Sequence, residues 1–289
     1  MGSMRIGILR TADDGPVKLA EHRGYFREQG LTVQVTEFQS GPEALTAVQG
    51  GSLDVALINY VSFIEAVDKG TVDGRVIAEA YQGTEDCLVL MVKPGSPIRE
   101  PKDLVGRKIA IHAPHNINEL LVRELLKLAS QDPDSPQYTA TKFPDMPAAL
   151  DSGAIDAAVM VEPYISKARQ DFGADARIKL VTGATAGIPL SGYVALTDYT
   201  TKNPAQVAAF QRAMSKANQA VETDRAALAD VLPDLTGIPK ESVSSLSLGT
   251  YPTSLSAERL QRVIDLMRTH GRITGNITAE AIIVPTPGG

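Results

Sequence analysis

Two histidines and a glutamate in the middle of the chain have types and a spacing that metal ions use. His112 and His115 lie three residues apart after a short apolar run, and Glu119 follows one helical turn later. Imidazoles and carboxylates are ligands that zinc accepts. The same stretch fits a loop that leads into a helix near Asn116, and we expect that loop, with no metal ion and no other cofactor.

The segment from His112 to Asn116 leaves two interpretations open. It is either a solvated loop or a helix N-terminus that faces a ligand. In the second case, the free backbone N–H groups and the helix dipole attract polar or anionic groups.

Acidic side chains occur where strands are expected to end. Glu162 precedes a proline that suits the first turn of a helix, so its carboxylate either caps that helix or contacts a ligand. Asp13, Asp14, Glu85 and Asp86 could bring negative charge to a binding site, which would favour a cationic or hydrogen-bond-donating ligand. Acids on loops are also often only solvated.

Motifs of common enzyme classes are missing from the sequence. It has no phosphate-binding Gly-x-x-x-x-Gly-Lys-Ser/Thr loop, no Gly-x-Gly-x-x-Gly turn and no Gly-x-Ser-x-Gly elbow. Its only cysteine, Cys87, excludes an intramolecular disulfide and is expected to be a small buried apolar residue. The net charge of −6 gives no basic surface for nucleic acid.

A repeated stretch indicates how the chain is organised. Residues 51–60 return in altered form as residues 153–162, each with a glycine, an aspartate and a short apolar run. The two aspartates, Asp54 and Asp156, lie 102 residues apart. This spacing is too long for a solenoid repeat and suits two lobes of similar build.

Apolar patterns and turn residues predict alternating strands and helices, which favours α/β lobes with largely parallel sheets. We expect strands at residues 5–10, 32–36, 55–58, 75–80, 87–92, 108–111, 138–143, 155–160, 178–181 and 191–196. We expect helices between residue 17 and Gly30, from Ser40, and at 61–70, 116–130, 146–152, 164–172, 204–223, 226–232 and 256–270. Strands 87–92 and 191–196 are expected to cross between lobes. Lobe 1 would comprise residues 5–90 and 191–289, and lobe 2 residues 91–190.

Four passages together resemble one family: the substrate-binding proteins of ABC importers in the nitrate, sulfonate, taurine and thiamine-pyrimidine-precursor group. The passages are residues 20–33, 41–70, 95–109 and 146–164. The resemblance implies a two-lobed type II periplasmic-binding-protein fold with two mixed, mostly parallel sheets flanked by helices. Two crossing strands would join the lobes, which close over a small solute.

The resemblance also implies where the solute is held: at strand-end loops and helix N-termini in a cleft between the lobes. The expected ligand-binding residues are Thr11, Asp13, Asp14, Gln39, Ser40, Asn59, Tyr60, Glu85, His112, His115, Asn116, Glu162 and Tyr193. Because Arg10 is the only cation near these positions, we expect a neutral or cationic heterocycle, an amine or an amide rather than a sulfonate or nitrate.

The resemblance implies a monomeric binding protein with no catalytic residues, which delivers its solute to a membrane permease and its ATPase. An extracytoplasmic location follows, in the periplasm or lipid-anchored at the cell surface. We expect residues 1–4 to be a cloning remnant and the signal segment to be absent from this chain. A natural start at Met4 would instead favour the alternative, a cytosolic enzyme on the same fold, similar to those of the menaquinone pathway.

Overall fold

The structure, a computed structural model, describes residues 2–286 and divides the chain into two compact units. Unit 1 contains the residues up to Gln82, the segment Pro189–Ser245 and the residues from Thr250 onward. Unit 2 contains Gly83–Ile188 and the short segment Leu246–Gly249. The sequence did not predict that this short C-terminal segment belongs to unit 2.

Each unit is built on a five-stranded sheet, and the two sheets have equivalent strand orders, β2-β1-β3-β10-β4 and β7-β6-β8-β5-β9. Only β10 in the first sheet and β5 in the second run against the other strands. The predicted α/β fold with mixed, mostly parallel sheets is therefore confirmed. The strands of unit 1 are β1 (Gly2–Ile8), β2 (Leu31–Glu37), β3 (Val55–Asn59), β4 (Gly74–Gln82) and β10 (Pro189–Leu196). Those of unit 2 are β5 (Leu88–Val92), β6 (Lys108–Ile111), β7 (Gln137–Ala140), β8 (Ala157–Val161) and β9 (Asp175–Lys179).

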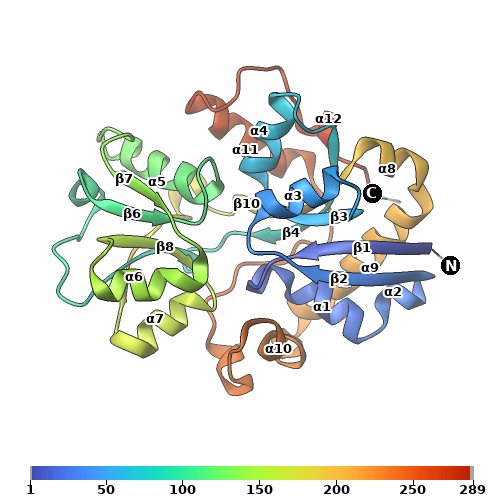
Figure 1. Ribbon diagram of the computed structural model, residues 1–289, viewed down its shortest axis with the longest axis horizontal. Helices are drawn as coiled ribbons and strands as arrows, with labels where there is room; N and C mark the ends of the chain where they lie inside the picture. The colour runs from blue at the N-terminus through green and yellow to red at the C-terminus, as the bar shows by residue number, and fades with distance from the viewer. Residues whose placement is uncertain (1, 287–289) are drawn as a thin grey trace. The chain divides into compact units, whose positions relative to one another are not determined.

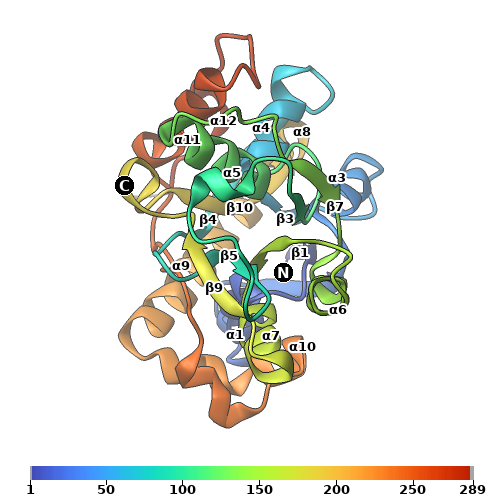
Figure 2. The same cartoon turned by 90° about the vertical axis from the view of Figure 1, so that its left-hand side faces the viewer.

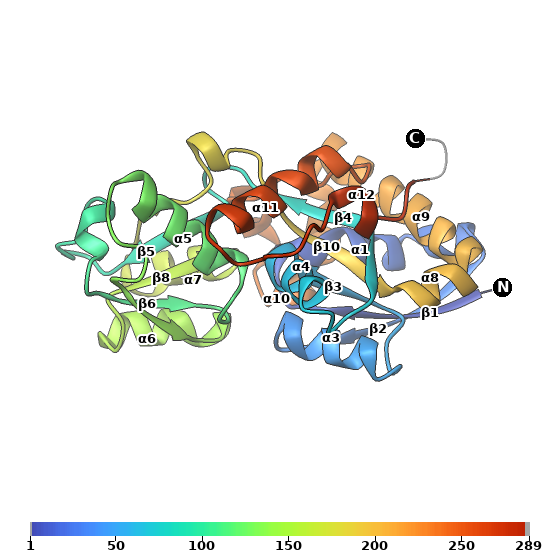
Figure 3. The same cartoon turned by 90° about the horizontal axis from the view of Figure 1, so that it is seen from above.

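Helices cover both faces of each sheet. In unit 1, helices α1, α2 and α9 pack on one face, and α4 and α11 pack on the other (Figure 1). Helices α11 and α12 follow one another along β10 and β4 (Figure 3). In unit 2, α5 lies on one face, and α6 and α7 lie on the other (Figure 2). The helices of unit 1 are α1 (Gly15–His22), α2 (Tyr25–Glu28), α3 (Gly41–Gln49), α4 (Tyr60–Asp68), α8 (Thr197–Lys202), α9 (Pro204–Thr223), α10 (Leu232–Thr236), α11 (Ala257–Thr269) and α12 (Ala279–Ile282). Those of unit 2 are α5 (Ile117–Leu128), α6 (Met146–Ser152) and α7 (Tyr164–Phe172).

Several boundaries differ from the prediction. Strand β1 starts at Gly2, three residues before the predicted start, because Gly2 and Ser3 pair with β2. The helix predicted to end at Gly30 is two helices, since Gly24 adopts a φ of 76° between them. The helix predicted at 226–232 is a 3-10 helix at Arg225–Asp230 followed by α10.

The two strands expected to cross between lobes are integral parts of the sheets. Strand β5 lies between β8 and β9 in unit 2, and β10 lies between β3 and β4 in unit 1. The chain leaves unit 1 after Gln82, before β5 begins, and returns at Pro189, where β10 begins. Each of these strands therefore supplies the antiparallel member of one sheet.

The repeated aspartates perform the same structural task in both units. The Asp54 carboxylate accepts the backbone N–H of Arg5 at 2.7 Å, and Asp156 accepts that of Lys108 at 2.8 Å. Each carboxylate thus ties the start of one strand to the neighbouring parallel strand. The repeat seen in the sequence reflects this shared connection, so neither aspartate is a candidate ligand contact.

Candidate functional site

In unit 1, one edge of the sheet gathers several of the predicted site residues. Strands β1, β2 and β3 are parallel and end at this edge, and the antiparallel β10 begins there, with Ser191 opposite Asn59. The carboxyl ends of parallel strands are where α/β sheets bind ligands. The predicted residues that follow these strands or end one are Thr11, Asp13, Asp14, Gln39, Ser40 and Asn59, while Tyr193 lies inside β10, paired with Leu57.

Two adjacent aspartates form the most strongly perturbed group at this edge. Asp13 accepts the hydroxyl proton of Ser191 at 2.7 Å, and burial raises its pKa to about 6. Asp14 is fully buried and accepts the Leu9 N–H at 2.8 Å and the Tyr193 hydroxyl at 3.2 Å. Burial, together with the charge of Asp13, raises the pKa of Asp14 well above its usual value. Asp14 and Tyr193 are thus an interior pair, whereas Asp13 is only partly buried.

The loop before α3 is held by the capping arrangement that the sequence predicted. Ser40 Oγ accepts the Glu43 N–H at 3.4 Å, and the Glu43 carboxylate accepts the Gln39 N–H at 3.1 Å. The carboxylate thus reaches one residue further back than in the usual capping box. This arrangement fixes the backbone of Gln39 and Ser40 beside the end of β2.

Asn59 and Tyr60, predicted together as ligand contacts, have different surroundings. Asn59 caps α4, because its Oδ1 accepts the Ser62 N–H at 3.0 Å. Tyr60 is 1% exposed, and its hydroxyl lies where a Cβ on Gly192 would be 2.4 Å away. Among the residues described, this hydroxyl has no hydrogen-bond partner. Burial, with the nearby Glu79 carboxylate, raises the pKa of Tyr60 well above its usual value. The structure thus assigns Tyr60 to the core of unit 1.

The corresponding edge of the unit 2 sheet also carries predicted residues. His112 follows β6 and Glu162 follows β8, and these two strands are parallel. Glu85 precedes the antiparallel β5, so it reaches the same edge. Glu85 and Asp86 both pair with Lys179, at 2.9 and 3.2 Å, on the surface. Lys179 supplies one positive charge for two carboxylates, so the three side chains together keep one net negative charge.

Glu162 is buried and engaged by three donors within unit 2. Its carboxylate accepts the N–H and hydroxyl of Ser166 at 3.1 and 3.0 Å and the N–H of Ser247 at 3.0 Å. The side chain is 2% exposed, and the Glu162-Pro163 peptide bond is cis. Of the two roles left open by the sequence, the structure supports that of a cap, and the same carboxylate fastens the segment Leu246–Gly249. Its role as a ligand contact stays a prediction.

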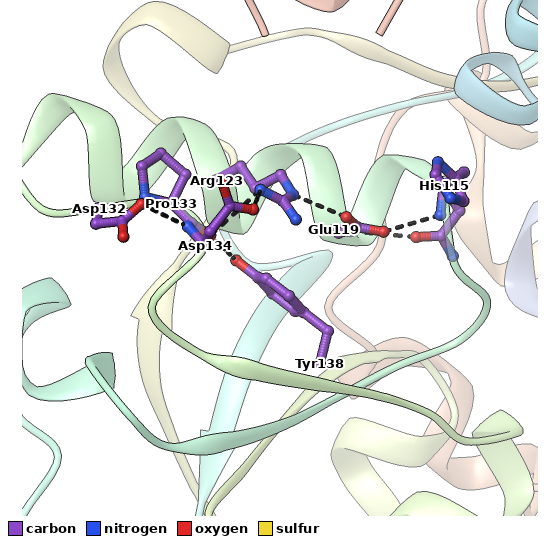
Figure 4. Close-up of polar contacts among 8 residues, drawn as sticks. His115, Glu119, Arg123, Asp132, Pro133, Asp134 and Tyr138 are labelled. Carbon is purple, nitrogen blue, oxygen red and sulfur yellow. Dashed lines mark hydrogen bonds and ion pairs between the residues drawn. The ribbon is translucent and has the colours of Figure 1, made fainter. Parts of the chain in front are cut away.

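Glu119 organises the start of α5 (Figure 4). The Glu119 carboxylate accepts the His115 N–H at 2.8 Å and pairs with Arg123 at 2.7 Å, while its own N–H donates to Asn116 Oδ1 at 3.1 Å. Arg123 also pairs with Asp134 at 2.6 Å. Within residues 2–286, no cluster of three or more His, Cys, Asp or Glu side chains has the geometry of a metal site.

His112 lies at the end of a stack of three rings. Its imidazole is 4.2 Å from the Phe143 ring at an interplanar angle of 6°, and Phe143 stacks on Tyr164 at 5.8 Å. Burial and the Lys142 charge lower the pKa of His112 to about 4, so its ring is neutral at pH 7. Phe143 and Tyr164 were not predicted as site residues. Their position directly after the β7 and β8 regions was the only sequence signal that could have indicated them.

The comparisons with known proteins agree on one family. The model of the NMT1-like family matches residues 2–233. A Bacillus subtilis protein named as an aliphatic sulfonates-binding protein is 26% identical over 258 residues, which cover 86% of this chain and 74% of that protein. The chain is 24% identical over 225 residues to the 4-amino-5-hydroxymethyl-2-methylpyrimidine phosphate synthase THI13 of Saccharomyces cerevisiae, covering 72% of this chain and 63% of that enzyme.

A solved structure extends the likeness to the whole fold. The periplasmic aliphatic sulphonate binding protein SsuA from Escherichia coli superposes with a TM-score of 0.79 at 22% identity. The superposition covers 98% of this chain and 97% of that chain. Among residues 2–286, no helix combines the length and apolarity that a membrane span requires.

Proposed function

The chain belongs to the NMT1-like family, and from that premise we propose that it is the solute-binding component of an ABC importer. Two of the similar proteins described above are named as sulfonate-binding proteins, and one of them is named as periplasmic. In both units, predicted polar site residues lie at the edge of the sheet where the parallel strands end. This is the edge at which α/β sheets bind ligands. The protein would work outside the cytoplasm as a monomer and deliver its solute to a membrane permease and its ATPase.

We propose that the solute is a small neutral or cationic heterocycle, an amine or an amide, rather than a sulfonate or nitrate. The observation that carries this proposal is the partly buried Asp13 beside Ser191, a group that disfavours a bound anion. Arg10 gives this edge no free cation, because its guanidinium donates to the Leu235 carbonyl at 2.9 Å and lies 3.7 Å from Glu37.

Capture of the solute would follow the usual thermodynamics of hinge closure. The solute favours the closed state only by as much as it binds that state more tightly than the open one. The ligand contacts inferred from the sequence, and their arrangement in a cleft, stay predictions.

The second candidate is an enzyme, and the likeness to the yeast pyrimidine phosphate synthase is the observation that favours it. The single cysteine, Cys87, is buried, and buried structural thiols are unreactive, which favours the receptor over an enzyme with a cysteine nucleophile. Turnover of any solute that the protein binds would support the enzyme, whereas recovery of the solute unchanged would support the receptor.

The test is a thermal-unfolding screen of protein that has been unfolded and refolded to remove any bound molecule. The panel contains amines, amides, nitrogen heterocycles, alkanesulfonates and nitrate. A true solute stabilises the folded state by about 2.7 kcal/mol at about 100 times its dissociation constant.

The matched variants are Asp13→Asn and the surface control Asp198→Asn, whose exposed carboxylate pairs with Lys202 at 2.8 Å. We expect Asp13→Asn to weaken binding of an amine and Asp198→Asn to leave it unchanged. Stabilisation by sulfonates alone would reject the proposed solute class but keep the receptor. No stabilisation by any class would reject the receptor.

A further inference from the structure

His112 has two hydrogen-bonding groups that the described part of the chain leaves unused. Both of its ring nitrogens are buried, and neither has a hydrogen-bond partner among residues 2–286. A neutral imidazole carries one N–H donor and one acceptor nitrogen. Buried polar atoms are nearly always paired in folded proteins, so two unpaired atoms on one ring call for a partner from outside the chain.

Among the described residues, the His112 ring is held in place by stacking on an aromatic ring rather than by hydrogen bonds. The Phe143 ring is nearly parallel to it with the ring centroids 4.2 Å apart, and Phe143 also stacks on Tyr164 at 5.8 Å. Phe143 is 8% exposed and belongs to the interior of unit 2. The stack therefore fixes the plane of the imidazole through its face and engages neither ring nitrogen.

The position of His112 in the fold is that of a ligand contact. It follows β6 directly, at the edge where the parallel strands of the unit 2 sheet end. Other predicted residues nearby have side chains that bond to the protein itself, since Glu162 accepts from Ser166 and Ser247, and Asn116 Oδ1 accepts the Glu119 N–H. Within residues 2–286, the ring nitrogens of His112 have no such hydrogen bond.

We propose that His112 is a specificity-determining residue that hydrogen-bonds the solute through its neutral imidazole and selects solutes offering both a donor and an acceptor. This inference rests on the proposed solute-binding function. A sulfonate or nitrate offers only acceptors, so it cannot pair with the acceptor nitrogen. A primary amide or an amino-substituted nitrogen heterocycle offers both groups.

The test uses minimal probes and a ring-preserving variant. Acetamide carries a donor and an acceptor, methanesulfonate only acceptors, and methylammonium only donors. Their binding is followed by the side-chain ¹⁵N signals of the histidines and by backbone amide shifts. His112→Phe keeps a flat ring against Phe143 without the nitrogens, and Phe143→Leu keeps the nitrogens without the stack.

We expect acetamide to shift the His112 ring nitrogens and to bind His112→Phe at least fivefold more weakly, while any methanesulfonate binding is the same in both proteins. His112→Phe should melt at or above the temperature of the wild type, because it removes two unpaired buried nitrogens. If His112→Phe does not fold, His112→Met provides the same comparison.

Three results would overturn the proposal: acetamide that leaves the nitrogens unshifted, acetamide that binds His112→Phe as it binds the wild type, or methanesulfonate binding that is lost in His112→Phe. The first two would mean that internal water satisfies the ring. If His112→Phe binds a solute of the wild type with unchanged affinity, only the role of His112 is rejected. A wild-type protein that binds no solute of any class would reject the proposed function itself.

Discussion

Replacing Glu162 by glutamine should destabilise unit 2, because the carboxylate serves three donors that one amide oxygen cannot serve. One oxygen accepts the Ser166 N–H, and the other accepts the Ser166 hydroxyl and the Ser247 N–H. In Glu162→Gln, the new NH₂ group faces either the Ser166 N–H or the Ser247 N–H, so one backbone donor loses its acceptor. A lost hydrogen bond to a charged group costs about 1.5–3 kcal/mol, and a lost negative charge at a helix N-terminus costs about 0.3–1 kcal/mol more. The expected loss is therefore about 2–4 kcal/mol.

The assay is urea unfolding followed by far-UV circular dichroism, since the chain contains no tryptophan. Hydrogen exchange adds spatial resolution, and exchange should accelerate in α7 and in the segment Leu246–Gly249. Glu258→Gln is the matched control, because Glu258 is an exposed acid in the first turn of α11. Ser166→Ala removes only the hydroxyl donor and should cost about 1 kcal/mol. A Glu162→Gln protein within about 0.5 kcal/mol of wild type, with unchanged exchange in both segments, would refute the capping role.

Four further outcomes are expected. Because the pKa of Asp13 is raised to about 6, its contribution to stability is greatest below its ordinary pKa and is lost as pH rises to about 6, a change of at most about 3 kcal/mol. Urea unfolding from pH 4 to 7 should show this loss in the wild type and not in Asp13→Asn, and equal slopes would contradict it. Gly192→Ala should lower stability by about 1–3 kcal/mol, because its Cβ would lie 2.4 Å from the Tyr60 hydroxyl. Tyr60→Phe should be neutral or stabilising by up to about 1 kcal/mol in thermal unfolding, whereas a clear loss would show that the hydroxyl has a partner. Asp156→Ala should cost about 1–2 kcal/mol in urea unfolding and leave solute affinity unchanged, because its carboxylate bonds the Lys108 N–H; a weakened affinity would assign it to the site.

Local patterns in the sequence were sufficient to predict most helices and strands. Helix α7 was predicted at its observed bounds, because Pro163 and Gly173 mark its two ends. Strand β1 was predicted to start three residues too late, since Gly2 and Ser3 have low strand propensity and are ordered by pairing with β2. Periodicity alone could not show that β5 lies inside a sheet, because a short apolar run fits either role.

The surroundings of the site residues depended on contacts between distant parts of the chain. Nothing near Tyr60 in the sequence indicates that Gly192 makes room for its ring. Likewise, Ser247 lies 85 residues from Glu162, and only the folded chain shows their hydrogen bond. The sequence could therefore predict which strand ends carry polar residues, but not which of those residues are already hydrogen-bonded or packed within the protein.

Native mass spectrometry tests the central claim most directly. The refolded protein, incubated with a small-molecule extract of bacterial cells, should take up one solute of low mass per chain and release it unchanged on denaturation. The account predicts that this solute carries a hydrogen-bond donor and no sulfonate or nitrate group. A protein that takes up nothing, or that returns the solute chemically altered, would contradict the claim that this chain is a solute receptor.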